Sequence, residues 1–235
     1  GGQALGYAEM AVVVEELART LSPEPVVASS VLSAGLLMGG ENDALKKALL
    51  AKIATGDAII GAGEVGRYSG EVSVTAKAAG SEAVLNGVAH HVYPALSATD
   101  FIVAAKGAEG VGLYRLPANA AGLSVKEVLR ADGTFAGTLT LKDVKVAAAD
   151  VVATGAKAEA AVRRATDAAT IMTCAELYAC MNQALDITVG YMQTRVQFGK
   201  PIGNFQALQH RTVDLWIQKE LAMGALADAV RALDN

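Results

Sequence analysis

Between two long helical patterns lies the stretch Arg195-Val196-Gln197-Phe198-Gly199-Lys200-Pro201-Ile202-Gly203-Asn204-Phe205-Gln206. Gly199, Pro201 and Gly203 interrupt the helical pattern, because proline lacks the N–H that a helix interior needs and glycine loses helical order. We expect Asn204 to cap the second helix through its side-chain oxygen. The stretch therefore predicts a junction between two helices that offers a guanidinium, free N–H donors and two aromatic rings. Such a junction suits a ligand that carries both phosphate and a ring.

Extended to His210, the stretch reads R-x-Q-F-G-x-P-I-x-x-F-Q-x-x-Q-H and closely resembles the helix-turn-helix of acyl-CoA dehydrogenases. In that family the corresponding Arg, Gln, Phe and Phe-Gln positions contact the FAD of a neighbouring subunit. The resemblance implies a flavoprotein oligomer in which FAD is bound by Arg195, Gln197, Phe198, Phe205 and Gln206. On spacing alone, the alternative is an ordinary helical hairpin with both phenylalanines in its core.

The composition favours one or two globular domains, because 235 residues with 52% hydrophobic content can bury an ample core. The formal charge of −4, without a basic run interleaved with aromatic residues, argues against nucleic acid as a partner. The sequence shows no signal peptide and no apolar run of membrane-spanning length. Cys174 and Cys180 lie too far apart along one helical pattern to form a disulfide. We therefore expect a reduced, cytoplasmic protein with no membrane partner.

The hydrophobic pattern changes its period twice along the chain. A helical period covers the first quarter, where Asn42 should cap a helix that ends at Gly56. Asn86-Gly87 then predicts a turn between two strands. Further short strands are predicted at 101–105, 111–116, 123–126 and 139–144, and together they suggest a small β-barrel or sandwich.

The helical period returns near residue 155, where small residues such as Ala165 predict a face that a neighbouring helix can approach closely. A stripe of apolar residues from Leu215 to Leu233 marks the last helix. We therefore predict an α+β fold with three parts: an N-terminal helical domain (1–57), a middle β-barrel domain (58–154) and a C-terminal helical bundle (155–235). Acyl-CoA dehydrogenases have this order, and the resemblance implies that both terminal domains are partial.

The segment Gly61-Ala62-Gly63-Glu64-Val65-Gly66 spells G-x-G-x-x-G, yet the residues after it do not have the pattern of a helix start. A dinucleotide-binding Rossmann motif needs that helix, so we do not assign one. Aligned with acyl-CoA dehydrogenases, the segment lies where a T-E-P-G-x-G-S-D loop covers the flavin. The resemblance implies a flavin contact by Glu64, whereas Gly63 replaces the Thr and Ser69 is a loose counterpart of the Ser.

Leu85-Asn86-Gly87 leads into a segment that matches the family pattern L-N-G-x-K-x-W-I-T-N. His91 falls at the Trp and Tyr93 at the Thr, two positions that lie beside the flavin ring in the family. The resemblance thus implies that His91 supplies a planar ring and Tyr93 a hydroxyl donor, and the alternative is a pocket that has decayed. We predict no metal site at His90 and His91, because no third ligand stands at a recognisable spacing.

Asp167 lies where the family has an Asp that hydrogen-bonds the CoA portion of the substrate, although a lone Asp on a helix is often a solvated charge. Some family members carry their catalytic Glu at the position of Ala169, which has no carboxylate. Other members keep that Glu on a later helix. The resemblance therefore implies a catalytic base beyond Asn235.

The resemblance implies an FAD-dependent oxidoreductase that introduces an α,β double bond into an acyl-CoA thioester. Its partners would be an electron-transfer flavoprotein or similar acceptor and further subunits, in a homotetramer or an α2β2 heterotetramer. One alternative is a catalytically incomplete subunit that lends Arg195 and Phe198 to the FAD of its neighbour, as in the paired subunits of actinobacterial steroid-degrading relatives. The other is a flavin monooxygenase of the same fold, which also lacks the Glu.

Overall fold

The computed structural model describes residues 5–63, 65, 72–80 and 82–234. Internal contacts divide the chain into two compact units. Residues 23–169 form what we call the sheet unit, and residues 1–22 with 170–235 form the helical unit. Glu64, for which we predicted a flavin contact, lies outside the described residues.

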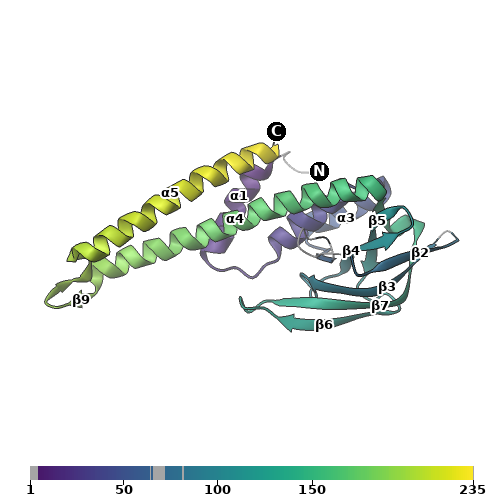
Figure 1. Cartoon of the computed structure of the whole chain (residues 1–235), viewed down its shortest axis with the longest axis horizontal. Helices are drawn as coiled ribbons and strands as arrows, with labels where there is room; N and C mark the ends of the chain where they lie inside the picture. Colours follow the sequence, from purple (N-terminus) through teal and green to yellow (C-terminus); the bar gives the residue numbers. More distant parts are fainter. Residues whose placement is uncertain (1–4, 64, 66–71, 81, 235) are drawn as a thin grey trace. The chain divides into compact units, whose positions relative to one another are not determined.

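The sheet unit contains one mixed sheet of eight strands in the order β6-β7-β3-β2-β4-β5-β8, with β1 parallel to β4 (Figure 1). The strands are β1 (Ile60–Gly63), β2 (Thr75–Ala79), β3 (Glu82–Val92), β4 (Asp100–Gly107), β5 (Gly110–Pro117), β6 (Leu123–Leu129), β7 (Phe135–Ala147) and β8 (Val151–Thr154). The predicted change from a helical to a strand period after the first quarter of the chain is confirmed.

The prediction of a closed barrel is wrong for the part of the chain that the structure describes, because β6 and β8 end the sheet and do not pair with each other. The long strands β3 and β7 curve instead, with register shifts between Leu85 and Gly87 and between Ala89 and Val92. Such bulges increase local twist. The curved sheet covers an apolar cluster whose buried members include Phe101, Val103 and Leu139.

The turn predicted at Asn86-Gly87 is also wrong, because both residues lie inside β3. Gly87 has φ +138°, and a Cβ there would lie 2.5 Å from the carbonyl oxygen of Ser73. The glycine therefore marks a bulge with close backbone approach, which gives the same sequence signal as a turn. Asn86 Nδ2 donates to Asp143 Oδ1 at 3.0 Å, and Asn86 Oδ1 accepts from the Asp143 N–H at 2.9 Å, so the amide ties β3 to β7.

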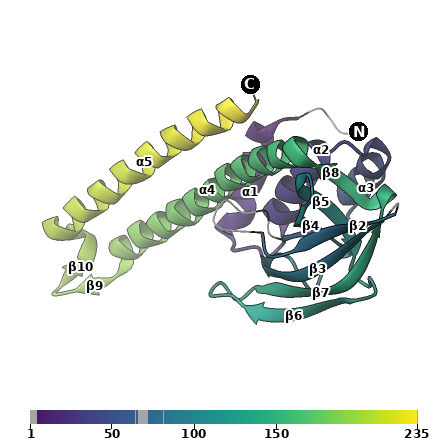
Figure 2. The same ribbon diagram turned by 45° about the vertical axis from the view of Figure 1, so that its right-hand side comes forward.

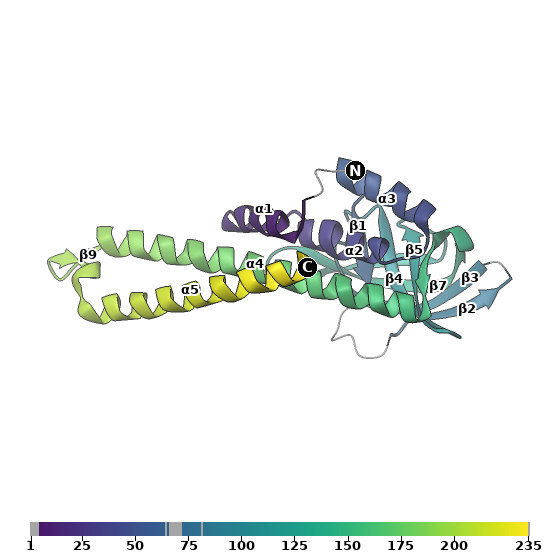
Figure 3. The same cartoon turned by 90° about the horizontal axis from the view of Figure 1, so that it is seen from above.

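Helices pack on the sheet through a second apolar cluster, as Figure 3 shows for α2 and α3 beside β1. They are the π-helix η1 (Val26–Ser33), α2 (Ala34–Met38), α3 (Asp43–Thr55) and the first turns of α4 (Gly155–Thr194); the 3-10 turn η2 (Ala148–Asp150) precedes α4 in the chain. The predicted Asn42 cap is confirmed, since its Oδ1 accepts from Leu45 N–H at 3.1 Å. The predicted small-residue face is also confirmed, because a Cβ on Gly35 would lie 3.0 Å from the Ala165 methyl.

The helical unit consists of α1 (Tyr7–Arg19), the rest of α4, and α5 (Gln206–Asp234), which runs back beside α4 (Figure 2). The backbone N–H groups of Tyr7 and Ala8 donate to the Asp234 carboxylate at 2.7 and 3.0 Å, so α5 caps α1. The apolar stripe of α5 is buried only toward its C-terminus, at Leu226 and Val230, whereas Leu215 is 56% exposed. Over the described ranges, no helix is both long and apolar enough to cross a lipid bilayer.

Candidate functional site

The junction between α4 and α5 is a tight hairpin, which we call the α4–α5 hairpin (residues 195–206). Its two strands, β9 (Val196–Gln197) and β10 (Lys200–Pro201), pair antiparallel, and the 3-10 turn η3 (Ile202–Asn204) comes next. Phe198 and Gly199 form the turn with φ +51° and +78°. Positive φ at both central positions is typical of a type I′ turn, which matches the twist of paired strands. The turn holds Phe198 at the tip of the hairpin.

Of the two aromatic residues of the hairpin, Phe198 lies at the surface and Phe205 is half-buried, which argues against a helical hairpin with both phenylalanines in its core. Phe198 is 91% exposed, and it is unfavourable to leave so much of a large apolar ring in water. The rings of Phe198 and Phe205 meet edge to face with centroids 6.0 Å apart. Lys200 Nζ lies 4.5 Å from the centre of the Phe205 ring, a contact that sequence spacing did not reveal. The hairpin thus offers ring surface next to positive charge.

Three polar side chains of the hairpin form no hydrogen bond or ion pair within the described part of the chain. Arg195, Gln197 and Gln206 are exposed, and none of the described residues forms a hydrogen bond or ion pair with their side chains. Residues 195–206 include Arg195 and Lys200 but neither Asp nor Glu. An unpaired guanidinium on a positively charged, ring-bearing surface fits a phosphate ester with an aromatic group. The residues present therefore fit a flavin nucleotide.

The backbone of the hairpin is held firmly although its side chains are exposed. The Arg195 N–H donates to the Tyr191 carbonyl, and its own carbonyl accepts from the Ile202 N–H, each at 2.8 Å. Gln209 Nε2 donates to the Gly203 carbonyl at 2.8 Å. The predicted Asn204 cap is wrong, because α5 starts at Gln206 and Asn204 belongs to η3.

In the sheet unit, Tyr93 is engaged in contacts within the protein. Its hydroxyl donates to the Pro23 carbonyl at 3.4 Å, and the Arg130 guanidinium lies 4.7 Å from the centre of its ring. Arg130 belongs to a turn in which Asp132 accepts hydrogen bonds from the side chain and N–H of Thr134, at 2.7 and 3.0 Å. These bonds lower the pKa of Asp132 below its usual value. Sequence reasoning missed Arg130, because it lies far from Tyr93 along the chain.

His91 lies beside Tyr93 at the irregular end of β3. It is exposed and has φ +55°, next to the register shift between Ala89 and Val92. The rings of His90 and His91 lie 6.3 Å apart with a 50° tilt, so they do not stack. Tyr93 also forms an antiparallel bridge with Ala62, so it lies next to β1, the strand that precedes residue 64 in the sequence.

Asp167 lies on α4 in a half-buried position and takes part in polar contacts. The preceding residue, Thr166, donates a hydroxyl hydrogen bond to the Val65 carbonyl at 3.1 Å, which ties α4 to the segment after β1. Ala169 is half-buried on the same helix. Among the described residues, no group of three His, Cys, Asp or Glu side chains is placed to hold a metal ion.

Comparison with known proteins shows what the chain is similar to. The profile "Acyl-CoA dehydrogenase, C-terminal domain" matches residues 156–235, which include the hairpin. The acyl-CoA dehydrogenase FadE27 of Mycobacterium tuberculosis is 30% identical over 217 residues, 92% of this chain and 57% of FadE27. Residues 156–235 thus match the acyl-CoA dehydrogenase family, and 92% of the chain is similar to one of its members.

Two further family members extend the comparison. The acyl-CoA dehydrogenase IpdE2 of Mycobacterium tuberculosis is 46% identical over 66 residues, 28% of this chain and 21% of IpdE2. The crystal structure of the ChsE4-ChsE5 complex from the same organism matches with a TM-score of 0.88 and 27% identity, over all of this chain and 64% of that chain. The chain thus spans less than two thirds of the length of each relative.

Proposed function

We propose that this protein is part of an FAD-dependent acyl-CoA dehydrogenase, in which the α4–α5 hairpin binds the FAD of a neighbouring subunit. The observation that carries the proposal is the exposed, unpaired set of Arg195, Gln197 and Phe198 at the hairpin tip. Similarity to acyl-CoA dehydrogenases supports FAD as the cofactor. When bound, FAD supplies the acceptor for the hydride that leaves the β-carbon of the acyl group.

The hairpin residues would act by binding and orientation. The Arg195 guanidinium would donate charge-assisted hydrogen bonds to phosphate oxygens, and Lys200 would add positive charge nearby. The exposed edge and face of Phe198 would pack against a ring of the nucleotide. Because the hairpin backbone is anchored by α4 and α5, these groups are preorganised, which lowers the entropic cost of binding.

The sheet unit would complete the site through the other predicted residues. We propose that Glu64, His91 and Tyr93 contact the flavin and that Asp167 contacts the CoA portion of the substrate, as the family resemblance implies. The Tyr93 hydroxyl would have to exchange its long bond to the Pro23 carbonyl for a bond to the ligand. The base that removes the α-proton is not assigned among the described residues, and its position beyond Asn235 stays a prediction.

A second candidate is a subunit that binds flavin for a neighbour but carries no base of its own. Ala169, which replaces the Glu of some family members, favours it. The two-protein ChsE4-ChsE5 complex among the structural relatives supports a mixed assembly as an alternative to a homotetramer. An electron-transfer flavoprotein would serve as the acceptor in either case. The cytoplasmic location and the three-domain division stay predictions.

The test is to purify the protein, incubate it with FAD, remove free FAD by gel filtration and record the absorption spectrum. We expect a flavin band that co-elutes with the protein. Reduction of an artificial electron acceptor is then measured with a panel of acyl-CoA thioesters, alone and after co-expression with a candidate partner. Activity alone supports the complete enzyme, and activity only after co-expression supports the partner subunit. Failure to retain FAD under both conditions would refute both.

A further inference from the structure

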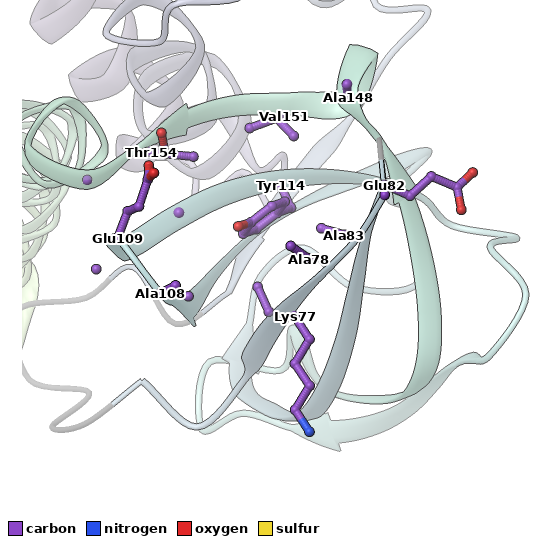
Figure 4. A pocket seen from close by; sticks show the side chains of 16 residues that line it. Lys77, Ala78, Glu82, Ala83, Ala108, Glu109, Tyr114, Ala148, Val151 and Thr154 are labelled. Carbon is purple, nitrogen blue, oxygen red and sulfur yellow. The ribbon is translucent and has the colours of Figure 1, made fainter.

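The sheet unit contains a cavity that the proposed flavin site does not use. It has a volume of about 610 Å³ and lies between the β2–β3 and β4–β5 turns, β8 and the start of α4 (Figure 4). Its walls are largely methyl groups and backbone, contributed among others by Ala78, Ala83, Ala108, Ala148 and Val151. A cavity of this volume falls within the range of small-molecule sites.

One buried residue presents a polar group to this cavity. Tyr114 on β5 is 7% exposed, and its ring stands at the centre of the cavity with the hydroxyl turned toward the side of Ala108 and Glu109 (Figure 4). None of the residues that the structure describes forms a hydrogen bond with this hydroxyl. The hydroxyl opens to the cavity, so it is free to donate a hydrogen bond to water or to a bound ligand.

Glycine keeps the space around the hydroxyl open. A Cβ on Gly112 would lie 2.6 Å from Tyr114 Oη, and a Cβ on Gly107 would lie 3.8 Å from the same atom. Burial raises the pKa of Tyr114, and the negative charge of Glu109 raises it further. The phenol therefore stays protonated at neutral pH and can donate a hydrogen bond.

The cavity is separate from the segment predicted to contact the flavin. It meets β3 at Glu82, whereas His91 lies at the opposite end of the same strand. Strands rise about 3.3 Å per residue, so the two ends of β3 are roughly 30 Å apart. A ligand in this cavity therefore does not contact His91 or Tyr93.

The charges around the cavity narrow the class of ligand. In Figure 4 the side chains of Lys77 and Glu82 extend away from Tyr114. Glu109 is close enough to affect the phenol, and its carboxylate disfavours an anion beside the hydroxyl. We propose that the cavity binds an uncharged, largely apolar small molecule whose carbonyl or hydroxyl oxygen accepts a hydrogen bond from Tyr114. This inference does not rest on the proposed function.

The proposal is tested by equilibrium dialysis with three probes of similar shape: 2-naphthol, 2-methylnaphthalene and 2-naphthoate. We expect the wild-type protein to bind 2-naphthol about fivefold more tightly than 2-methylnaphthalene, because one neutral hydrogen bond is gained. The anion 2-naphthoate should bind more weakly than 2-naphthol. Tyr114→Phe should remove the preference for 2-naphthol and keep the binding of 2-methylnaphthalene.

Two further variants locate the binding. Ala108→Trp, at a turn position, should fill the cavity beside the hydroxyl and weaken binding of both neutral probes. Tyr7→Phe, in the helical unit, is the matched control and should change nothing. The proposal is overturned if the wild-type protein binds neither neutral probe, or if Tyr114→Phe keeps its full preference for 2-naphthol.

Discussion

The α4–α5 hairpin and the segment around Tyr93 hold two sets of candidate flavin residues, and their side chains differ in what they already contact. Arg195, Gln197 and Phe198 extend from an anchored backbone and form no hydrogen bond or ion pair with other described residues. Tyr93 instead bonds the Pro23 carbonyl and lies under Arg130. An exposed side chain without internal hydrogen bonds or ion pairs adds little to stability, so its chemistry is available to a ligand.

This difference predicts opposite effects for the same type of substitution in the two regions. Hairpin variants should lose ligand and keep their stability, whereas variants around Tyr93 should lose stability. Paired variants, one from each region, test that contrast through their changes in unfolding free energy.

The largest contrast is expected between Gly61→Ala and Gly199→Ala. A Cβ at Gly61 would clash with the Pro94 carbonyl oxygen and lie 3.0 Å from the Phe101 ring, so we expect a loss of about 3 kcal/mol in unfolding free energy. Gly199 has φ +78° and nothing within 4 Å of a Cβ, so its variant should lose only about 1 kcal/mol. Urea unfolding measures both. Equal losses would contradict the view that the backbone around Gly61, next to Tyr93, is packed more tightly than the tip of the hairpin.

A smaller contrast is expected between Tyr93→Phe and Phe198→Ala. Loss of the Tyr93 hydroxyl removes its hydrogen bond to Pro23, which is worth about 1 kcal/mol at most. Phe198 is 91% exposed, so its truncation should change stability by less than about 0.5 kcal/mol. The same variant should weaken FAD binding about fivefold through lost ring contact. Thermal unfolding and FAD titration of both variants check this pair, and a stability loss in Phe198→Ala larger than in Tyr93→Phe would reverse it.

The smallest effect concerns the turn that carries Arg130. Hydrogen bonds from Thr134 lower the pKa of Asp132 below its usual 3.8, so Thr134→Ala should raise that pKa toward 3.8. A carboxyl whose folded pKa is depressed adds stability above its unfolded pKa and loses it as pH falls through the folded pKa. Because Asp132 is exposed, the stability that Thr134→Ala loses should be slight. The loss should be present above pH 3.8 and should disappear as the pH falls through the folded pKa of Asp132. An NMR titration of the Asp132 carboxyl measures the shift directly, and an unchanged pKa in the variant would contradict the assignment.

Much of the architecture was predictable because it depends on local signals. Gly199 and Pro201 marked the hairpin, and the change of hydrophobic period marked the sheet. A glycine in a strand pattern can mark either a turn or a bulge. The turn predicted at Asn86-Gly87 was therefore wrong, because the glycine marks a bulge. The open sheet could not be predicted, because closure depends on whether the distant strands β6 and β8 pair.

The candidate site, too, was predictable only where its residues are close in sequence. The hairpin residues were predicted as a group because they are close in sequence, and they lie within one short hairpin in which the rings of Phe198 and Phe205 meet. The contacts that occupy Tyr93 come from Pro23 and Arg130, which lie far from it in sequence. The cavity around Tyr114 is likewise formed by turns of separate hairpins, so it has no motif.

The most direct test is the FAD affinity and thermal stability of Arg195→Ala, compared with Arg231→Ala. Arg231 is an exposed arginine of the same unit, and its ion pair with Asp228 is solvent-exposed. We predict that Arg195→Ala weakens FAD binding about 10- to 100-fold, as expected for lost charge-assisted hydrogen bonds, while its melting temperature stays unchanged. Arg231→Ala should match the wild-type protein in both measurements. Unchanged FAD affinity in Arg195→Ala would contradict the assignment of the hairpin as the flavin-binding surface.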